Sequence, residues 1–375
     1  MSGGFRTHAG LGSRGNRLAM AAERMSAIQV SGYGDPEELI SFSSSVQRPQ
    51  LKGKGKILVR VLAVSLAPGD CRVMSGKTSL VQGPPSFPYV PGGDLCGVVA
   101  EVSQGEKKFK PGDRVVCTFD TAGPRNALAE YKLVNCANAA LAPPSPELSA
   151  EQLCALPSSA LSAMLLCEKY VRPEDRVLVL GASGGVGCHL VQMLKPKGAS
   201  YVAAVSSQQE LLLGLGVDRV VDYQKEKWWE IPEFCESPFD LVVDLVGTKE
   251  VWKTAASSKA VKSGYQQGRY VTTVGDTPYM TAKHWWHIFG IMYDMQAHSC
   301  WTSIARSNPK WIYHLGLEPK GNLERLLKLA ETGELKPVLD SVHSFDAESV
   351  KKAFQIQKGK HAHGKVVIRV ADEAK

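Results

Sequence analysis

The residues best suited to chemistry form a short, glycine-rich stretch near the middle of the chain. Four aliphatic residues at 177–180 are followed by seven residues at 181–187, none larger than valine. The aliphatic run is typical of a parallel strand covered on both faces. A turn without bulk lets a pyrophosphate approach the backbone, and the free N–H groups and dipole of the next helix favour phosphate oxygens. We therefore predict a phosphate-binding turn formed by Ala182, Ser183, Gly184, Gly185, Val186 and Gly187.

The glycine spacing matches part of the usual dinucleotide-binding fingerprint. Gly184 and Gly187 are in register with it, whereas Ala182 stands where the fingerprint has glycine. Gly187 would let the helix pack closely on the strand. A glycine-rich turn without a ligand is the competing interpretation, but the position between a predicted strand and a predicted helix favours a binding site.

The elements that must position this turn fall into two patterned regions. Helical segments alternate with predicted strands at 176–180, 201–205, 218–221, 239–244 and 269–274. This alternation predicts an α/β fold with a Rossmann-type, doubly wound parallel sheet. Upstream, short strands broken by proline and glycine turns predict a compact β-rich domain. The β-branched run at 365–370 predicts a final strand that returns to that domain.

These patterns divide the chain into four predicted segments. They are a tail or targeting segment at 1–24, the first part of the β-rich domain at 25–153, the dinucleotide-binding domain at 154–320 and the return segment at 321–375. Four of the seven tryptophans, Trp285, Trp286, Trp301 and Trp311, lie within 276–320. They are compatible with an apolar pocket, a subunit interface or ordinary core packing.

Composition narrows the class of protein. The 375 residues carry a net charge of +7, but Lys and Arg are spread along the chain without a nucleic-acid motif, which argues against nucleic-acid binding. No apolar run approaches the roughly 20 residues that span a bilayer. Nine scattered cysteines without a CxxC pair indicate free thiols in a reducing compartment. We expect a cytoplasmic protein, with a mitochondrial one as the alternative if the arginine-containing segment 1–24 is a transit peptide.

Several motifs together resemble a known family. The run 182–187, with Gln192 and Lys195 after it and Asp175 and Leu178 before it, is similar to the quinone oxidoreductase signature of the medium-chain dehydrogenase/reductase superfamily. Glu174 departs from that signature. Further landmarks occur in the expected order at 88–94, 111–115, 129–131, 156–163 and 364–367. The resemblance covers about residues 25–370 and implies a groES-like β domain built from both chain ends around a Rossmann domain, with the active site between them and a homodimeric assembly.

The resemblance also bears on metal binding. Zinc-dependent members of the superfamily have an early Cys and a later Gly-His-Glu, and here those positions look like Ala67 and Gly92-Gly93-Asp94. Ala67 and Gly93 offer no ligand atoms for zinc. We therefore expect no metal site and no zinc.

The cofactor implied by the resemblance is a nicotinamide dinucleotide. Enzymes that prefer NAD hold the ribose 2′-OH with an acid about 20 residues past the glycines, but Ser206 and Ser207 stand there. Tyr223 matches a tyrosine of the family's NADPH enzymes, whereas their loop lysine is missing. We expect NADPH in preference to NADH. The nicotinamide and ribose would be bordered by residues at two strand ends, namely Val246, Gly247, Val274 and Gly275.

The expected chemistry is direct hydride transfer to a quinone or an α,β-unsaturated carbonyl. No proton donor can be assigned, and the candidate catalytic residues are Asp70, Arg72 and Ser162. Capping of the turn after Pro68 is the competing role for Asp70. Two other functions stay open: an enoyl-thioester reductase, and a nucleotide-binding protein of low turnover with a structural or RNA-associated role.

Overall fold

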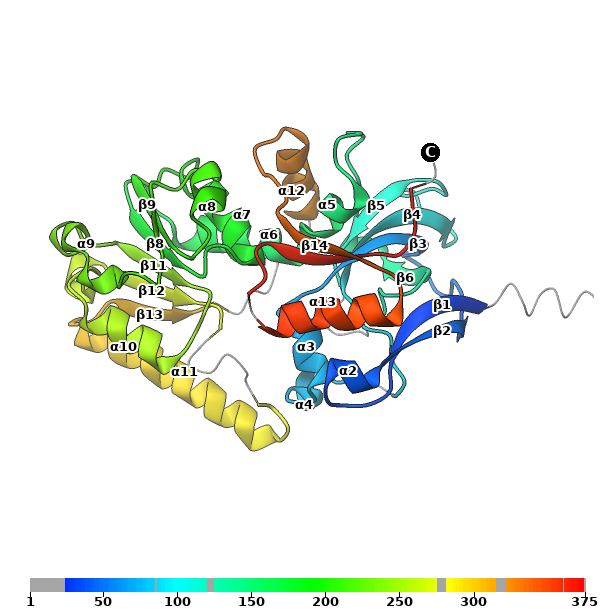
Figure 1. Cartoon of the computed structure of the whole chain (residues 1–375), viewed down its shortest axis with the longest axis horizontal. Coiled ribbons are helices and arrows are strands. Elements are labelled where there is room, and N and C mark those ends of the chain that lie inside the picture. The colour runs from blue at the N-terminus through cyan, green and yellow to red at the C-terminus, as the bar shows by residue number, and fades with distance from the viewer. Residues whose placement is uncertain are drawn as a thin grey trace, which may run out of the picture.

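The computed structural model describes residues 24–84, 86–119, 125–274, 281–314, 322–359 and 361–373. Figure 1 shows two large sheets in separate lobes, a parallel sheet on the left and a mainly antiparallel sheet on the right. The predicted α/β fold is therefore confirmed. The predicted targeting segment, apart from Arg24, and the predicted site residue Gly275 lie outside the described residues.

The parallel sheet carries the glycine-rich turn. Its strands are β8 (Arg176–Leu180), β9 (Tyr201–Val205), β10 (Arg219–Val221), β11 (Leu241–Asp244), β12 (Arg269–Thr272) and β13 (Lys310–Tyr313). They pair in the order β10-β9-β8-β11-β12-β13, so the chain changes direction across the sheet beside β8. In open α/β sheets, ligands bind at the carboxyl ends of the strands at such a switch point.

Helices cover both faces of this sheet. They are α6 (Pro157–Tyr170), α7 (Gly185–Leu194), α8 (Gln209–Gly214), α9 (Pro232–Glu236), α10 (Lys249–Ser257) and α11 (Trp285–Ala305), with the short 3-10 turns η2 (Trp228–Glu230) and η3 (Gly264–Gln266). Val177 and Val179 of β8 pack into one core, and Leu178 and Leu180 pack into another on the opposite face. The aliphatic run is thus buried on both sides, as its composition predicts.

The second sheet is built from both ends of the chain. Its strands are β3 (Lys56–Ser65), β4 (Asp94–Val102), β5 (Arg114–Cys117), β6 (Tyr131–Asn135), β7 (Ala139–Leu141), β14 (Leu339–Ser344) and β15 (Lys365–Arg369). The final strand β15 pairs antiparallel with β3, which confirms the predicted return of the chain. A separate hairpin joins β1 (Arg24–Val30) and β2 (Ile40–Gln47).

Short helices surround this second sheet. They are α2 (Pro36–Leu39), α3 (Pro68–Met74), α4 (Ser79–Gln82), η1 (Cys136–Asn138), α5 (Ala150–Cys154), α12 (Asn322–Glu331) and α13 (Ala347–Gly359). Ser149 and Gln152 form the expected capping box at the start of α5. Leucines of α5, α6 and α12 share one core with Leu62 of β3, which packs the two lobes together.

The aromatic-rich region resolves into α11 and β13. Trp311 is buried in the core, whereas Trp285, Trp286 and Trp301 are 64%, 66% and 57% exposed. The interpretation as core packing is therefore correct for Trp311 and wrong for the other three tryptophans. In the described part of the chain, no helix is both long enough and apolar enough to cross a membrane.

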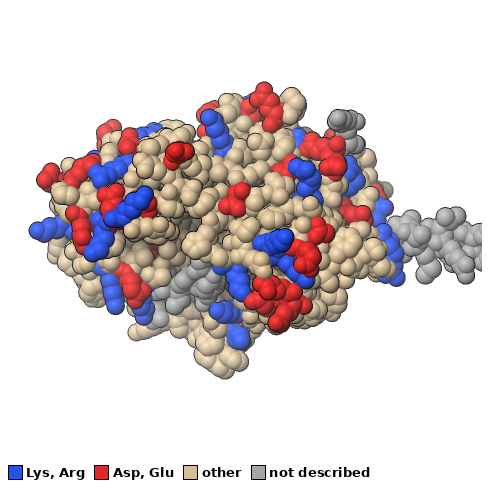
Figure 2. Space-filling view, viewed as in Figure 1, with Lys and Arg blue, Asp and Glu red and all other residues tan. Residues whose placement is uncertain are grey.

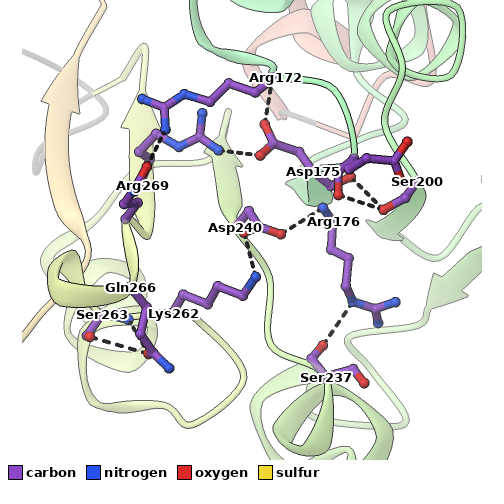
Figure 3. A network of polar contacts seen from close by, with 12 residues as sticks. Arg172, Asp175, Arg176, Ser200, Ser237, Asp240, Lys262, Ser263, Gln266 and Arg269 are labelled. Atoms are coloured by element: carbon purple, nitrogen blue, oxygen red, sulfur yellow. Dashed lines mark hydrogen bonds and ion pairs between the residues drawn. The ribbon is translucent and has the colours of Figure 1, made fainter.

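A polar network ties together the amino ends of β8, β11 and β12, opposite the edge that carries the glycine turn (Figure 3). Asp240 accepts hydrogen bonds from the backbone N–H of Arg176 and from Lys262. Asp175 pairs with Arg269 over 2.6 Å, and both side chains are nearly inaccessible. These contacts fix the starts of three adjacent strands and leave their carboxyl ends available for a ligand.

Candidate active site

The turn between β8 and α7 has the geometry of a phosphate-binding loop. Gly181 has a φ of +76°, a backbone conformation that favours glycine. A Cβ on Gly187 would lie 2.5 Å from the carbonyl oxygen of Ala182 and 2.6 Å from that of Gly181. The predicted role of Gly187 in close strand–helix packing is therefore confirmed.

Gly184, which caps α7, behaves differently. A Cβ there would lie 3.5 Å from the carbonyl oxygen of Gly181, which is an ordinary contact, and its φ of −72° suits any residue. The fold itself therefore does not require glycine at 184. This open backbone lies at the N-terminus of a ten-residue helix, where free N–H groups and the helix dipole favour anions in general.

The carboxyl end of β9 approaches the same turn. The Ser206 hydroxyl is buried and lies 2.8 Å from the Ser183 hydroxyl, and its backbone N–H donates to Val221 at the end of β10. Ser207 follows it and is half-buried, and Tyr223, beyond β10, is 55% exposed. The structure thus gathers the predicted serines and the tyrosine at one edge, without an acid at 206 or 207 that would repel a 2′-phosphate.

Asp244, at the carboxyl end of β11, organises the next turn. One carboxylate oxygen accepts the N–H groups of Val246 (2.9 Å) and Gly247 (3.0 Å), and the other accepts the Tyr270 hydroxyl at 2.6 Å. Burial raises the pKa of the Asp244 carboxyl, and these hydrogen bonds oppose the rise. The turn leaves Val246 47% exposed at the predicted position.

Val274 lies just past the end of β12, where its N–H donates to the Thr272 hydroxyl at 3.2 Å. The predicted strand at 269–274 is therefore two residues too long. Sequence reasoning also missed Asp244, although an acid at a predicted strand end, two residues before the predicted Val246-Gly247 pair, was a signal for it.

The two lobes meet directly over the glycine turn. The N–H of Gly364 donates to the carbonyl oxygen of Ser183 at 2.8 Å. Next to it, the stem of Lys365 passes over Gly185, where a Cβ would lie 2.8 Å from Lys365 Cδ. The Lys365 ammonium donates to the carbonyl oxygen of Leu66 at 2.7 Å, and burial lowers its pKa. One buried side chain therefore links the glycine-rich turn to the segment that begins α3.

The helix α3 contains two of the three candidate catalytic residues. Asp70 accepts the N–H of Ala67 at 2.9 Å, so the competing capping role is confirmed, and it also pairs with Arg125 over 3.2 Å. Arg72 acts electrostatically on Tyr313 at the carboxyl end of β13, which places α3 opposite the parallel sheet. Burial raises the pKa of the Tyr313 phenol, and Arg72 opposes the rise.

Ser162, the third candidate, lies in α6 and donates to the carbonyl oxygen of Ser158 at 2.8 Å. Its hydroxyl is therefore engaged within its own helix. The structure brings Asp70 and Arg72 together and leaves Ser162 one helical turn beyond Ser158, whose own hydroxyl contacts Asp94.

The residues at the metal-ligand positions do not suit zinc. Ala67 and Gly93 have no ligand atoms, and Asp94 is held by Ser158 and Thr118. Among the residues that the structure describes, no three His, Cys, Asp or Glu side chains gather closely enough to hold a metal ion.

Comparison with known proteins gives the family. A GroES-like alcohol dehydrogenase domain model matches residues 53–144, and a zinc-binding dehydrogenase model matches residues 215–368. The chain is 32% identical to 2-methylene-furan-3-one reductase of Solanum lycopersicum, covering 92% of this chain and 79% of that protein. It is 30% identical to the chloroplastic NADPH-dependent alkenal/one oxidoreductase of Arabidopsis thaliana, with coverage of 93% and 81%. It is also 30% identical to the human mitochondrial NAD(P)H oxidoreductase RTN4IP1, with coverage of 92% and 89%.

Solved structures agree on the fold. The quinone oxidoreductase of Coxiella burnetii superposes with a TM-score of 0.73 at 23% identity, covering 92% of this chain and 99% of that one. Escherichia coli quinone oxidoreductase in complex with NADPH gives a TM-score of 0.68 at 20% identity, with coverage of 92% and 100%. A groES-like lobe joined to a Rossmann lobe defines a two-domain oxidoreductase. The chain belongs to the medium-chain dehydrogenase/reductase superfamily, in its quinone-oxidoreductase-like branch.

Proposed function

We propose that this protein is an NADPH-dependent, zinc-independent reductase of quinones or α,β-unsaturated carbonyls. The observation that carries the proposal is the turn at 181–187, in which Gly187 is required by packing but Gly184 is not. A bare backbone at 184 is explained by a ligand that lies against it. The names of the relatives, which include quinone and alkenal/one oxidoreductases, support the substrate class over a thioester or a low-turnover role.

Each part of the cofactor has a matching set of residues. The pyrophosphate would lie on Ala182–Gly187 at the start of α7, and the ribose 2′-phosphate beside Ser206, Ser207 and Tyr223. The nicotinamide and its ribose would border Val246, Gly247 and the strand end at Val274. When bound, the reduced nicotinamide supplies hydride, and the residues of this chain orient it and exclude water.

Zinc independence rests on the ligand positions. Because Ala67 and Gly93 cannot coordinate a metal, polarisation of the acceptor must come from the protein's own groups. Among the predicted catalytic residues, Arg72 remains the candidate for a group facing the acceptor, and Asp70 acts through its neighbours.

We also propose a homodimer. In the described residues, β13 is an edge strand that pairs only with β12, and α11 beside it exposes Trp285, Trp286 and Phe289. A large exposed aromatic surface of this kind favours a protein partner. Light scattering coupled to size exclusion tests this, and a monomer at micromolar concentration would contradict it.

For localisation, the relatives include mitochondrial and chloroplastic proteins, which favours the mitochondrial alternative over a cytoplasmic protein. Residues 1–24 fused to a fluorescent protein test this. Diffuse cytosolic fluorescence would leave the cytoplasmic expectation standing.

The decisive experiment measures oxidation of NADPH and NADH with a panel of quinones, enals and enoyl-thioesters. We expect turnover with quinones or enals and a preference for NADPH. Gly184→Asp should abolish turnover, because the added carboxylate would occupy the proposed phosphate position and repel the phosphate. Gly359→Asp is the matched control, since a Cβ there meets nothing within 4 Å at the end of α13. Full activity of Gly184→Asp would remove the cofactor assignment.

A further inference from the structure

One buried arginine lies beside Gly93, a position that the sequence resemblance aligns with a zinc ligand. The guanidinium of Arg125 lies over the Phe119 ring at 4.2 Å, and its side chain is 11% exposed. A Cβ on Gly69 would lie 2.7 Å from Nη2 of Arg125, and a Cβ on Gly93 would lie 3.3 Å from Nη1. The two glycines therefore make room for this cation, and Gly93 stands where zinc-dependent members have histidine.

The surroundings of Arg125 contain more positive than negative groups. Asp70 pairs with Arg125 and Asp94 is held by Ser158, whereas Lys132 and Lys365 are buried nearby and act electrostatically on both carboxylates. Two carboxylates thus face three basic side chains. Burial lowers the pKa of Lys132 to about 8 and also lowers that of Lys365, while an arginine keeps its proton.

A buried tyrosine hydroxyl near Arg125 has no hydrogen-bond partner among the described residues. The Tyr89 hydroxyl is buried, makes no hydrogen bond in the described structure, and interacts electrostatically with Arg125 and Asp70. A buried hydroxyl without a partner is costly unless a ligand completes it. A cationic excess beside an unpartnered donor suits an oxygen that becomes negative during reaction.

We propose that the Arg125 guanidinium binds the carbonyl oxygen of the electron acceptor and stabilises the negative charge that this oxygen gains. This inference rests on the proposed function and assigns to a side chain the task that a metal performs as a Lewis acid. Asp70 is then a positioning residue, because it holds Arg125 through one oxygen and the Ala67 backbone through the other.

The proposed step is hydride transfer to the acceptor, with an enolate as the species that Arg125 stabilises. Hydride, carrying two electrons, leaves the reduced nicotinamide and forms a C–H bond at the β-carbon of the acceptor. The carbon–carbon π bond breaks, and its electron pair passes through the α-carbon to the carbonyl oxygen as an enolate, which Arg125 stabilises. A proton from water then reaches the α-carbon, the carbonyl re-forms, and oxidised cofactor remains.

The test compares Arg125→Gln and Arg125→Lys with a control at Arg48. Arg48 makes the same kinds of contact with groups that do not surround Arg125, since its guanidinium lies 4.2 Å over Tyr131 and pairs with Glu101. The first readout is the apparent pKa of bound 4-nitrophenol, followed by absorbance with and without NADP⁺. We expect the full chain and Arg48→Gln to lower this pKa, Arg125→Gln to lose the effect, and Arg125→Lys to keep part of it.

The second readout is turnover of an enal with NADPH. Arg125→Gln should lower kcat by about 100-fold, the usual effect of removing one oxyanion donor, with unchanged NADPH affinity and partial rescue by added guanidinium. Wild-type kcat and nitrophenol pKa in Arg125→Gln would overturn the inference. If that variant does not fold, the inference is overturned when Arg125→Lys keeps the full wild-type kcat and nitrophenol pKa, or when the wild-type protein leaves the nitrophenol pKa at its free-solution value. An Arg125-dependent nitrophenol shift in a protein that reduces no acceptor would support this inference and remove the proposed function.

Discussion

The two glycines of the phosphate turn should respond in opposite ways to the same substitution. In Gly187→Ala, the added methyl group would lie 2.5 Å and 2.6 Å from two backbone oxygens that cannot move independently. Overpacking of this kind typically costs about 1–3 kcal/mol, more than the roughly 1 kcal/mol by which alanine exceeds glycine in helix propensity. We therefore expect Gly187→Ala to lower the free energy of unfolding and the Tm by several degrees.

In Gly184→Ala, the methyl group meets only an ordinary contact at 3.5 Å. The free energy of unfolding should change by less than about 1 kcal/mol, the usual scale for exchanges at a helix N-cap. The methyl group would nevertheless hold a pyrophosphate away from the backbone. We expect the NADPH Kd to rise at least about tenfold, which corresponds to 1.4 kcal/mol of binding free energy.

Thermal unfolding and a fluorescence titration of NADPH measure the two effects separately. We expect Gly184→Ala to be stable but to bind NADPH poorly, and Gly187→Ala to be unstable. If Gly184→Ala bound NADPH with wild-type affinity, the open backbone at 184 would have no ligand to explain it. If Gly187→Ala were as stable as the wild type, the conclusion that close packing between the turn and α7 requires glycine at 187 would be wrong.

Three further predictions follow from buried charges and from the metal-ligand positions. Arg269→Ala should destabilise the fold by about 3–5 kcal/mol, because it leaves Asp175 buried without its 2.6 Å ion pair; equal urea midpoints for variant and wild type would contradict this. Burial lowers the pKa of His189 to about 4 from its usual 6.5, so its contribution to stability is complete above pH 6.5 and is lost as pH falls toward 4. His189→Gln should flatten this part of the stability–pH curve relative to wild type, by up to about 3 kcal/mol, and an unchanged curve would refute the assignment. Prolonged dialysis against EDTA should leave NADPH-dependent turnover unchanged, and metal analysis should find substoichiometric zinc; loss of activity that zinc restores would show that the ligand positions were misread.

Local patterns predicted much of the fold and part of the site. The strands around 177–180 and the packing role of Gly187 follow from composition and spacing within a dozen residues, as does the capping role of Asp70. The predicted domain limits stay a prediction. The aromatic helix α11 could not be assigned because its apolar residues surround the helix, so no periodicity marks a buried face.

The groups that complete the site come from distant parts of the chain. Arg125 reaches Asp70 across 55 positions, and Lys365 reaches Leu66 across 299. No local pattern marks such a pair, because each residue alone looks like an ordinary surface cation. Their burial becomes visible only when the distant segments of the β-rich lobe are folded together.

The contact between Gly364 and Ser183 brings the start of the last strand to the proposed nucleotide site, although the strand itself belongs to the β-rich lobe. A chain shortened before residue 364 would therefore lose β15, the inner strand that joins β14 to β3, together with the backbone contact to the glycine-rich turn of the other lobe. Because both losses come from one short segment, folding of the carboxyl terminus and acquisition of the nucleotide should be coupled: ligand would protect the final strand from proteolysis, and a damaged terminus would give a protein that releases its ligand.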